Sequence, residues 1–204
     1  MAPARDPRFD IAFERLADIH AQVARGSHFR GYRAIPVAGM GALALAAAAC
    51  EPLFVAAAAP EAHASYWLSV AAVAATAGAA DLFVRRRSLS GPGTWSAVLQ
   101  LVPSLVCGLV MAFVLQDRAE LLPGIWTTLF GLGVLASRPY LPTAIHGVAL
   151  FYIAAGLAMT LASKEGSVNS PWAMGLTFGI GQFVSAAALR RSAAPPPDSE
   201  EGFE

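Results

Sequence analysis

The sequence predicts an all-α, polytopic transmembrane helix bundle of six spans, with a short amphipathic cytoplasmic helix before the first span. The chain has 204 residues, of which 56% are hydrophobic and 14% are charged, whereas roughly 25% of the residues of a soluble domain are charged. Six apolar stretches are close to the roughly 20 residues that a helix needs to cross a bilayer. They are rich in Ala and Leu, which favour helices, and lack the strict alternation of barrel strands.

The composition excludes several other classes of protein. Lys and Arg (14) balance Asp and Glu (14), so no net positive charge is present to bind nucleic acid. Cys50 and Cys107 both lie in apolar stretches, which excludes a disulfide scaffold and predicts two small buried side chains. The hydrophobicity excludes a disordered chain.

The first element is a cytoplasmic tail over residues 1–34. Apolar residues recur in it at helical spacing and predict an amphipathic helix over about 8–25 that ends near Gly26. The residues of this apolar face are Phe9, Phe13, Leu16, Ile19 and Val23. The face would bind a protein partner or the membrane surface; the pattern also fits a helix that lies against the bundle and fixes the first span.

The transmembrane domain follows over residues 35–189. Its spans are predicted at 35–59, 66–84, 95–115, 121–137, 143–163 and 171–189. The fourth is the weakest, because Pro123 and Gly124 occupy its first turn. Residues 190–204 are Pro-rich and then acidic, which predicts a disordered cytoplasmic tail.

Basic residues predict the orientation of the bundle. All Lys and Arg except Arg118 and Lys164 lie in the N-terminal tail, the 85–94 and 137–142 loops, or the C-terminal segment. Both termini are therefore expected in the cytoplasm, with the loops 60–65, 116–120 and 164–170 outside. Ala62-His63-Ala64 has the form of a signal-peptidase site, but the apolar run before it is too long for a signal peptide, and we expect an uncleaved span.

Glu51 is the carboxylate expected deepest in the bilayer, about 12 Å from the outer edge. An ionisable group at that depth costs roughly 3 kcal/mol or more and is a candidate functional group. Pro52 deprives the Ala48 carbonyl of its helical donor, and Thr127 and Thr128 are the expected nearest polar groups. Glu51 is either a protonated structural pin or a carboxylate that couples transport to a proton or ion.

A second set of polar residues is expected at one depth near the cytoplasmic end. These residues are Asp81, Gln100, His146 and Gln182. They would form an inner vestibule, although Asp81 would equally pair with Arg85 four residues later. His20, His28 and His63 are expected in the tail or an outer loop.

The sequence lacks a phosphate-binding loop, a zinc-binding motif and a serine-nucleophile motif. We therefore expect no catalytic residue, no metal and no cofactor. The leading hypothesis is a non-enzymatic accessory or sensory membrane protein whose tail helix binds a protein partner. Small-residue faces such as Gly175-x-x-x-Gly179 would pack helices or form a homo-oligomer. The alternative is a small transporter or ion- or proton-coupled carrier that uses Glu51.

Three segments resemble those of uncharacterised bacterial inner-membrane proteins of similar length. The segments are FRGYRA (29–34), GLGVLASRPYLP (131–142) and PWAMGLTFGIGQ (171–182). The resemblance implies a multi-pass protein of the inner membrane and carries no activity or site residue with it.

Overall fold

The computed structural model describes residues 33–55, 60–85, 92–163 and 170–192. These residues form α-helices and short 3-10 helices, with no strand among them. The long helices are α2 (Ala34–Phe54), α3 (Pro60–Arg85), α4 (Pro92–Val114), α5 (Leu122–Ala136), α6 (Ala144–Ser163) and α7 (Pro171–Ser192), and the 3-10 helices are η1 (Gln116–Leu121) and η2 (Arg138–Tyr140). With η1 continuing into α5, the described part of the chain has six segments long and apolar enough to cross a membrane. The predicted all-α bundle of six spans is confirmed.

The junction between the first two spans differs from the prediction. α2 ends at Phe54 and not at residue 59, and Val55 after it is extended. α3 begins at Pro60 and not at residue 66, so the expected outer loop 60–65 is helical. Proline fits the first turn of a helix because it lacks the N–H that would have no partner there, and Glu61 suits the positive end of the helix dipole.

Two other boundaries also shift. The expected outer loop 116–120 is the 3-10 helix η1. At the other end of the bundle, α7 continues through Arg190 and Arg191 to Ser192, so the predicted tail starts later than residue 190. The tail helix predicted at 8–25 and the rest of the C-terminal tail lie outside the described residues.

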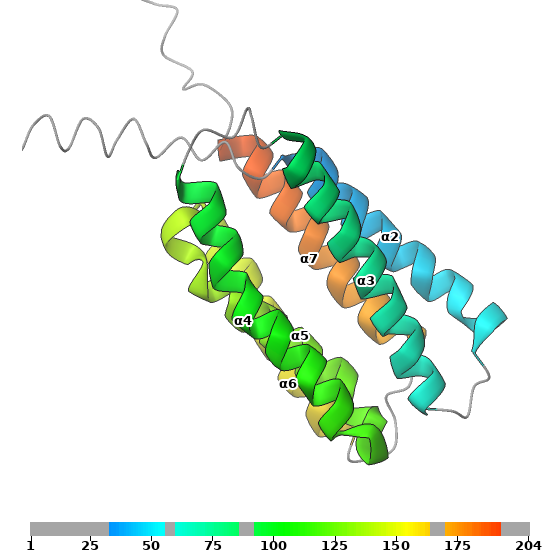
Figure 1. Cartoon of the computed structure of the whole chain (residues 1–204). Helices are drawn as coiled ribbons and strands as arrows, with labels where there is room; N and C mark the ends of the chain where they lie inside the picture. Colours follow the sequence, from blue (N-terminus) through cyan, green and yellow to red (C-terminus); the bar gives the residue numbers. More distant parts are fainter. Residues whose placement is uncertain (1–32, 56–59, 86–91, 164–169, 193–204) are drawn as a thin grey trace, which may run out of the picture.

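The helices form two groups of three, which do not follow the two halves of the sequence (Figure 1). α2, α3 and α7 form the first group, in which α2 packs along α7. α4, α5 and α6 form the second group, in which α5 packs along α6, and contacts between α6 and α7 join the groups. Successive helices run in opposite directions, so Ala34 and Ser192 lie at one end of the bundle, called here the terminal end. The end of α2 at Phe54 and the start of α3 at Pro60 lie at the other end, called here the hairpin end.

Small residues allow the close approach of α2 and α7. A Cβ on Gly175 would overlap the Ala48 side chain, and one on Gly179 would lie 2.8 Å from Leu45. The predicted packing face Gly175-x-x-x-Gly179 is therefore confirmed, and it contacts α2 within the bundle.

The outer surface of the described bundle is apolar. α3 and α4 are mostly exposed, and large hydrophobic side chains such as Val73, Phe83 and Phe113 lie on this surface. Such a surface on helices of spanning length is the one expected of a multi-pass membrane protein. Cys50 is exposed and Cys107 is half-buried, so the expectation of two buried cysteines is wrong.

Candidate functional site

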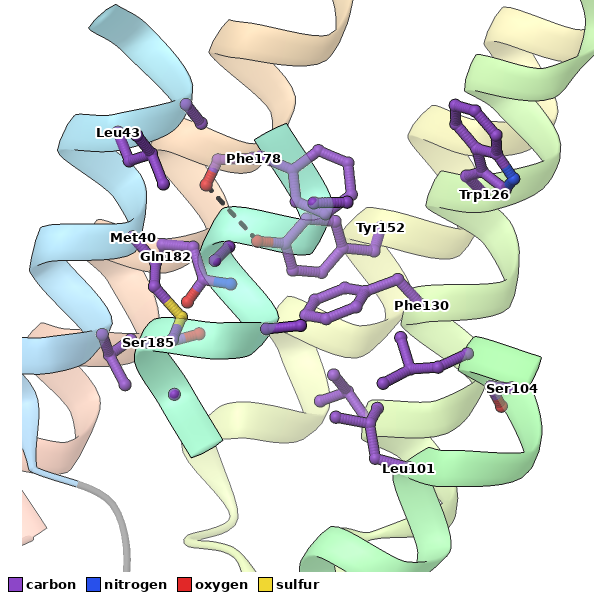
Figure 2. A pocket seen from close by; sticks show the side chains of 18 of the residues that line it. Met40, Leu43, Leu101, Ser104, Trp126, Phe130, Tyr152, Phe178, Gln182 and Ser185 are labelled. Atoms are coloured by element: carbon purple, nitrogen blue, oxygen red, sulfur yellow. Dashed lines mark hydrogen bonds between the residues drawn. The ribbon is translucent and has the colours of Figure 1, made fainter. Parts of the chain in front are cut away.

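A cavity of about 620 Å³ lies between the two helix groups. Side chains from all six long helices line it (Figure 2). Its volume lies within the range of roughly 300–1,000 Å³ that is typical of ligand sites. The cavity is therefore large enough to hold a molecule inside the bundle.

Most of the cavity wall is aliphatic or aromatic. Phe130 of α5, Tyr152 of α6 and Phe178 of α7 meet in the wall, with ring centroids 5.0 to 5.3 Å apart. Figure 2 shows these three rings together, with Tyr152 directed at Phe178. The Tyr152 hydroxyl donates to the Phe178 carbonyl oxygen at 3.4 Å, which satisfies its polar atom. Two indoles, Trp67 and Trp126, complete the aromatic wall toward the hairpin end.

The polar residues of the wall lie between the middle of the bundle and its terminal end. Arg33 precedes α2, Asp81 lies one turn before the end of α3, and Ser185 lies about two turns before the end of α7. Gln182 and Ser104 lie near the middle of α7 and α4. Ser137 is also at the terminal end, but its hydroxyl donates to the Ala97 carbonyl at 2.9 Å and is already bonded. The cavity is therefore amphipathic along its length.

The structure brings together only part of the predicted inner vestibule. Asp81 and Gln182 both line the cavity, whereas Gln100 and His146 are not among its lining residues. Gln100 Oε1 and His146 Nε2 are buried without a hydrogen-bond partner in the described part of the chain. Asp81 does make an interaction; whether its partner is Arg85 stays a prediction, because the Arg85 side chain is outside the described set.

Glu51 is buried, as predicted, and only 3% of it is exposed. Its partners are different from those predicted. Trp67 Nε1 donates to Glu51 Oε2 at 2.7 Å, and His63 Nδ1 is hydrogen-bonded to Glu51 Oε1. Thr127 and Thr128 instead donate to carbonyl oxygens of their own helix, at 2.8 and 2.9 Å.

The expectation that His63 is a surface histidine is wrong. It lies in the first turn of α3 and is buried to the same extent as Glu51. The cause is the early start of α3 at Pro60, which gives His63 and Trp67 the i, i+4 spacing of one helix face. That spacing is visible in the sequence, but the segment has too many polar residues to resemble a span.

Glu51 also lies closer to the end of its helix than expected. It is three residues from Phe54, which is about 5 Å along the axis. It is not among the lining residues of the cavity; the buried indole of Trp67 is, and lies between the cavity and the carboxylate. Trp67 is thus the one described side chain that both lines the cavity and bonds to Glu51.

The described residues contain no cluster of three or more His, Cys, Asp or Glu able to hold a metal ion. The predicted partner-binding face of the tail, from Phe9 to Val23, lies outside them. No protein-family model, curated protein or solved structure matches the chain.

Proposed function

We propose that the protein binds an amphipathic molecule of the bilayer, with the apolar tail in the cavity and the polar head at the terminal end. The observation that carries this proposal is the uneven lining of the cavity: its hairpin half is aromatic and aliphatic, and its polar side chains lie from the middle of the bundle to the terminal end. Each square ångström of apolar surface that a tail buries there contributes about 25 cal/mol.

The lining argues against a small polar substrate. A sugar or an amino acid buried among Trp126, Phe130 and Phe178 would lose hydrogen bonds to water, at several kcal/mol for each unpaired group. An oxygen-bearing head group between Arg33 and Ser185 would instead meet hydrogen-bond donors. The same arrangement keeps the tail away from polar side chains.

Access from the side of the bundle fits this ligand class. α3 and α4 border the two groups on the same side (Figure 1), and neither packs extensively on the other. A molecule dissolved in the bilayer would enter between these two helices without leaving the hydrocarbon. A site of this kind suits a carrier or a lipid sensor. We propose it in place of the inner vestibule for a hydrated ion.

We further propose that the protein lies in a bacterial inner membrane with both termini in the cytoplasm. The support is the distribution of arginine among the described residues: Arg33, Arg85, Arg138, Arg190 and Arg191 lie at the terminal end, and Arg118 lies at the hairpin end. Cytoplasmic ends carry the excess of basic residues. The head group would then sit in the cytoplasmic leaflet.

The binding test uses N-dodecyl dansylamide, a neutral amphiphile, with the full chain in a mild detergent. Trp67 and Trp126 line the cavity, so a bound dansyl group will accept energy from them, and the transfer will saturate. Ala74→Phe on α3 fills part of the cavity, and we expect the dissociation constant to rise about fivefold or more, since overpacking costs about 1–3 kcal/mol.

The matched control is Ala77→Phe. Ala77 lies on the same helix, is exposed and is not a lining residue, so this variant should bind as the unmodified protein does. Equal affinity for all three proteins, or transfer that does not saturate, would refute the proposed site.

A further inference from the structure

A buried polar cluster of Glu51, His63 and Trp67 lies near the hairpin end of the bundle. Each of the three residues is at least 96% buried. Both carboxylate oxygens of Glu51 are occupied, Oε1 by His63 and Oε2 by Trp67. The cluster therefore fixes α3 to α2 and also holds two titratable groups in contact.

The charge of this cluster depends on one proton. An indole N–H only donates, so Trp67 cannot neutralise the carboxylate. Among the described residues, His63 is the group that forms an ion pair with Glu51. A neutral imidazole beside a carboxylate has a net charge of minus one. One additional proton makes the pair neutral overall, whether the histidine or the carboxylate holds it. Without it, the pair leaves one negative charge buried at bundle depth, which is costly.

The second nitrogen of His63 gives the pair a position for a further proton. His63 Nε2 is buried and has no hydrogen-bond partner in the described part of the chain. A histidine tautomer is normally set by the hydrogen bonds of its ring nitrogens. Because a carboxylate only accepts, the neutral ring carries its proton on Nδ1 and has a lone pair at Nε2, where it can accept a second proton while Nδ1 stays on Glu51.

Trp67 connects this pair to the cavity. Its indole lines the cavity wall, and its N–H binds the carboxylate oxygen that His63 leaves free. One aromatic ring, the Trp67 indole, therefore separates the Glu51–His63 pair from a ligand in the cavity.

We propose that Glu51 and His63 form a proton-binding site, and that its occupancy sets the affinity of the cavity through Trp67. The coupling rests on the proposed amphiphile site. When the proton is lost, a net negative charge lies behind the apolar wall and favours water near it. A ligand whose apolar tail contacts Trp67 then binds more weakly.

Other titratable groups lie near the pair, and a pH effect that arises from them must be distinguished from one that arises from the pair. On α2, Cys50 is exposed; on α3, Glu61 is exposed and Tyr66 donates to the Ala47 carbonyl at 2.8 Å. η1, which packs against α3, carries Asp117, Arg118 and Glu120. The described residues of α5 and α7 that pack around Trp67 are Trp126, Met174 and Phe178, none of which titrates. Asp81 lines the opposite end of the cavity.

The experiment measures the affinity of the neutral probe N-dodecyl dansylamide between about pH 5 and about pH 8. As pH rises, we expect this affinity to fall about fivefold or more. In Glu51→Gln and in His63→Gln, the affinity should not change with pH.

Two tryptophan variants test the route. Trp67→Phe keeps the Glu51–His63 pair but removes its link to the cavity, and should lose the pH dependence. Trp126→Phe is the matched control: Trp126 also lines the cavity, but its N–H donates to the Gly108 carbonyl at 2.8 Å, so the pH dependence should remain.

The outcomes separate the two proposals. Saturable binding with the same pH dependence in Glu51→Gln and the unmodified protein overturns the proton site and leaves the amphiphile site intact. Failure of the probe to bind at any pH overturns the amphiphile site and the coupling to it. In that case ¹⁵N-histidine spectra decide the proton site: a His63 protonation that Glu51→Gln leaves unchanged refutes it.

Discussion

Gly124 of α5 and Gly156 of α6 face each other so closely that neither position has room for a side chain. A Cβ on either glycine would lie 2.7 Å from the carbonyl oxygen of the other. The residues one turn later, Thr128 and Thr160, each donate to the carbonyl of the glycine in their own helix at 2.9 Å. Because both contact positions are glycines, α5 and α6 approach backbone to backbone. This packing holds Phe130 of α5 and Tyr152 of α6 in the cavity wall.

We expect Gly124→Ala and Gly156→Ala each to lower the free energy of unfolding by about 1–3 kcal/mol, because the added methyl group has to push two backbones apart. Unfolding of the purified protein by a denaturing detergent, followed by tryptophan fluorescence, measures this change.

Gly147→Ala is the control for this contact. Gly147 lies on the same helix as Gly156, and a Cβ there would meet nothing within 4 Å. Alanine favours a helix over glycine by up to about 1 kcal/mol, so this variant should be as stable as the unmodified protein or more stable. Loss of stability in Gly147→Ala equal to that in Gly156→Ala would contradict the close contact.

A single hydroxyl links the end of α5 to the start of α4. Ser137 is 3% exposed, and its Oγ donates to the Ala97 carbonyl of α4 at 2.9 Å. Hydrogen bonds between membrane helices contribute on average about 0.6 kcal/mol, and Ser137→Ala should reduce stability by about that amount in the same unfolding assay.

Ser69→Ala makes the same chemical change without an interhelical bond. The Ser69 hydroxyl is exposed and donates to the Ser65 carbonyl of its own helix at 2.9 Å. Its loss should leave stability nearly unchanged. If the two variants behave alike, the Ser137 bond does not hold α4 to α5.

The orientation of the bundle is tested with reporter fusions in the two connecting segments that flank α3. A fusion after Ala58 should give active alkaline phosphatase, which folds only outside the cytoplasm, and a fusion after Arg87 should give a fluorescent cytoplasmic reporter. This follows from the basic residues near the terminal end. A position such as Ala64 is unsuitable because it lies inside α3. The opposite pattern of activity would reverse the orientation.

The number and type of the helices could be predicted from the sequence because the hydrocarbon thickness sets one length for every span. The junction at 54–66 could not. Alanines at 56–59 continue the hydropathy of α2 beyond its end at Phe54, whereas the polar residues Glu61 and His63 hide the start of α3 at Pro60. Hydropathy measures transfer to lipid, and a polar residue with a partner inside the bundle is not transferred to lipid.

The candidate site was less accessible to prediction, for geometric reasons. Counting residues along a helix gives the depth of Asp81, Gln100, His146 and Gln182 but not the direction in which each side chain points, and only the first and last line the cavity. The cavity itself arises from the packing of α2, α3 and α7 against α4, α5 and α6. Its lining alanines and leucines are the same residue types that face lipid, so composition does not distinguish them.

The last prediction concerns the tail helix expected at 8–25, which lies outside the described residues. If its apolar face binds a protein partner, Phe13→Asp together with Leu16→Asp will place two charges on that face and abolish binding, because burying an unpaired carboxylate costs several kcal/mol. A pull-down of the intact protein from mild detergent measures the loss.

The control for the tail is Ala21→Asp together with Gln22→Asp, which adds the same two charges. At 3.6 residues per turn these positions lie away from the Phe13–Leu16 face, so the partner should still be recovered. Recovery of the same proteins by all three forms, or of none by any form, would exclude partner capture by this face. If the helix instead lies against the bundle, the Phe13 and Leu16 changes will reduce resistance to the denaturing detergent while those at Ala21 and Gln22 will not, because only the first pair would remove apolar contacts with the first span.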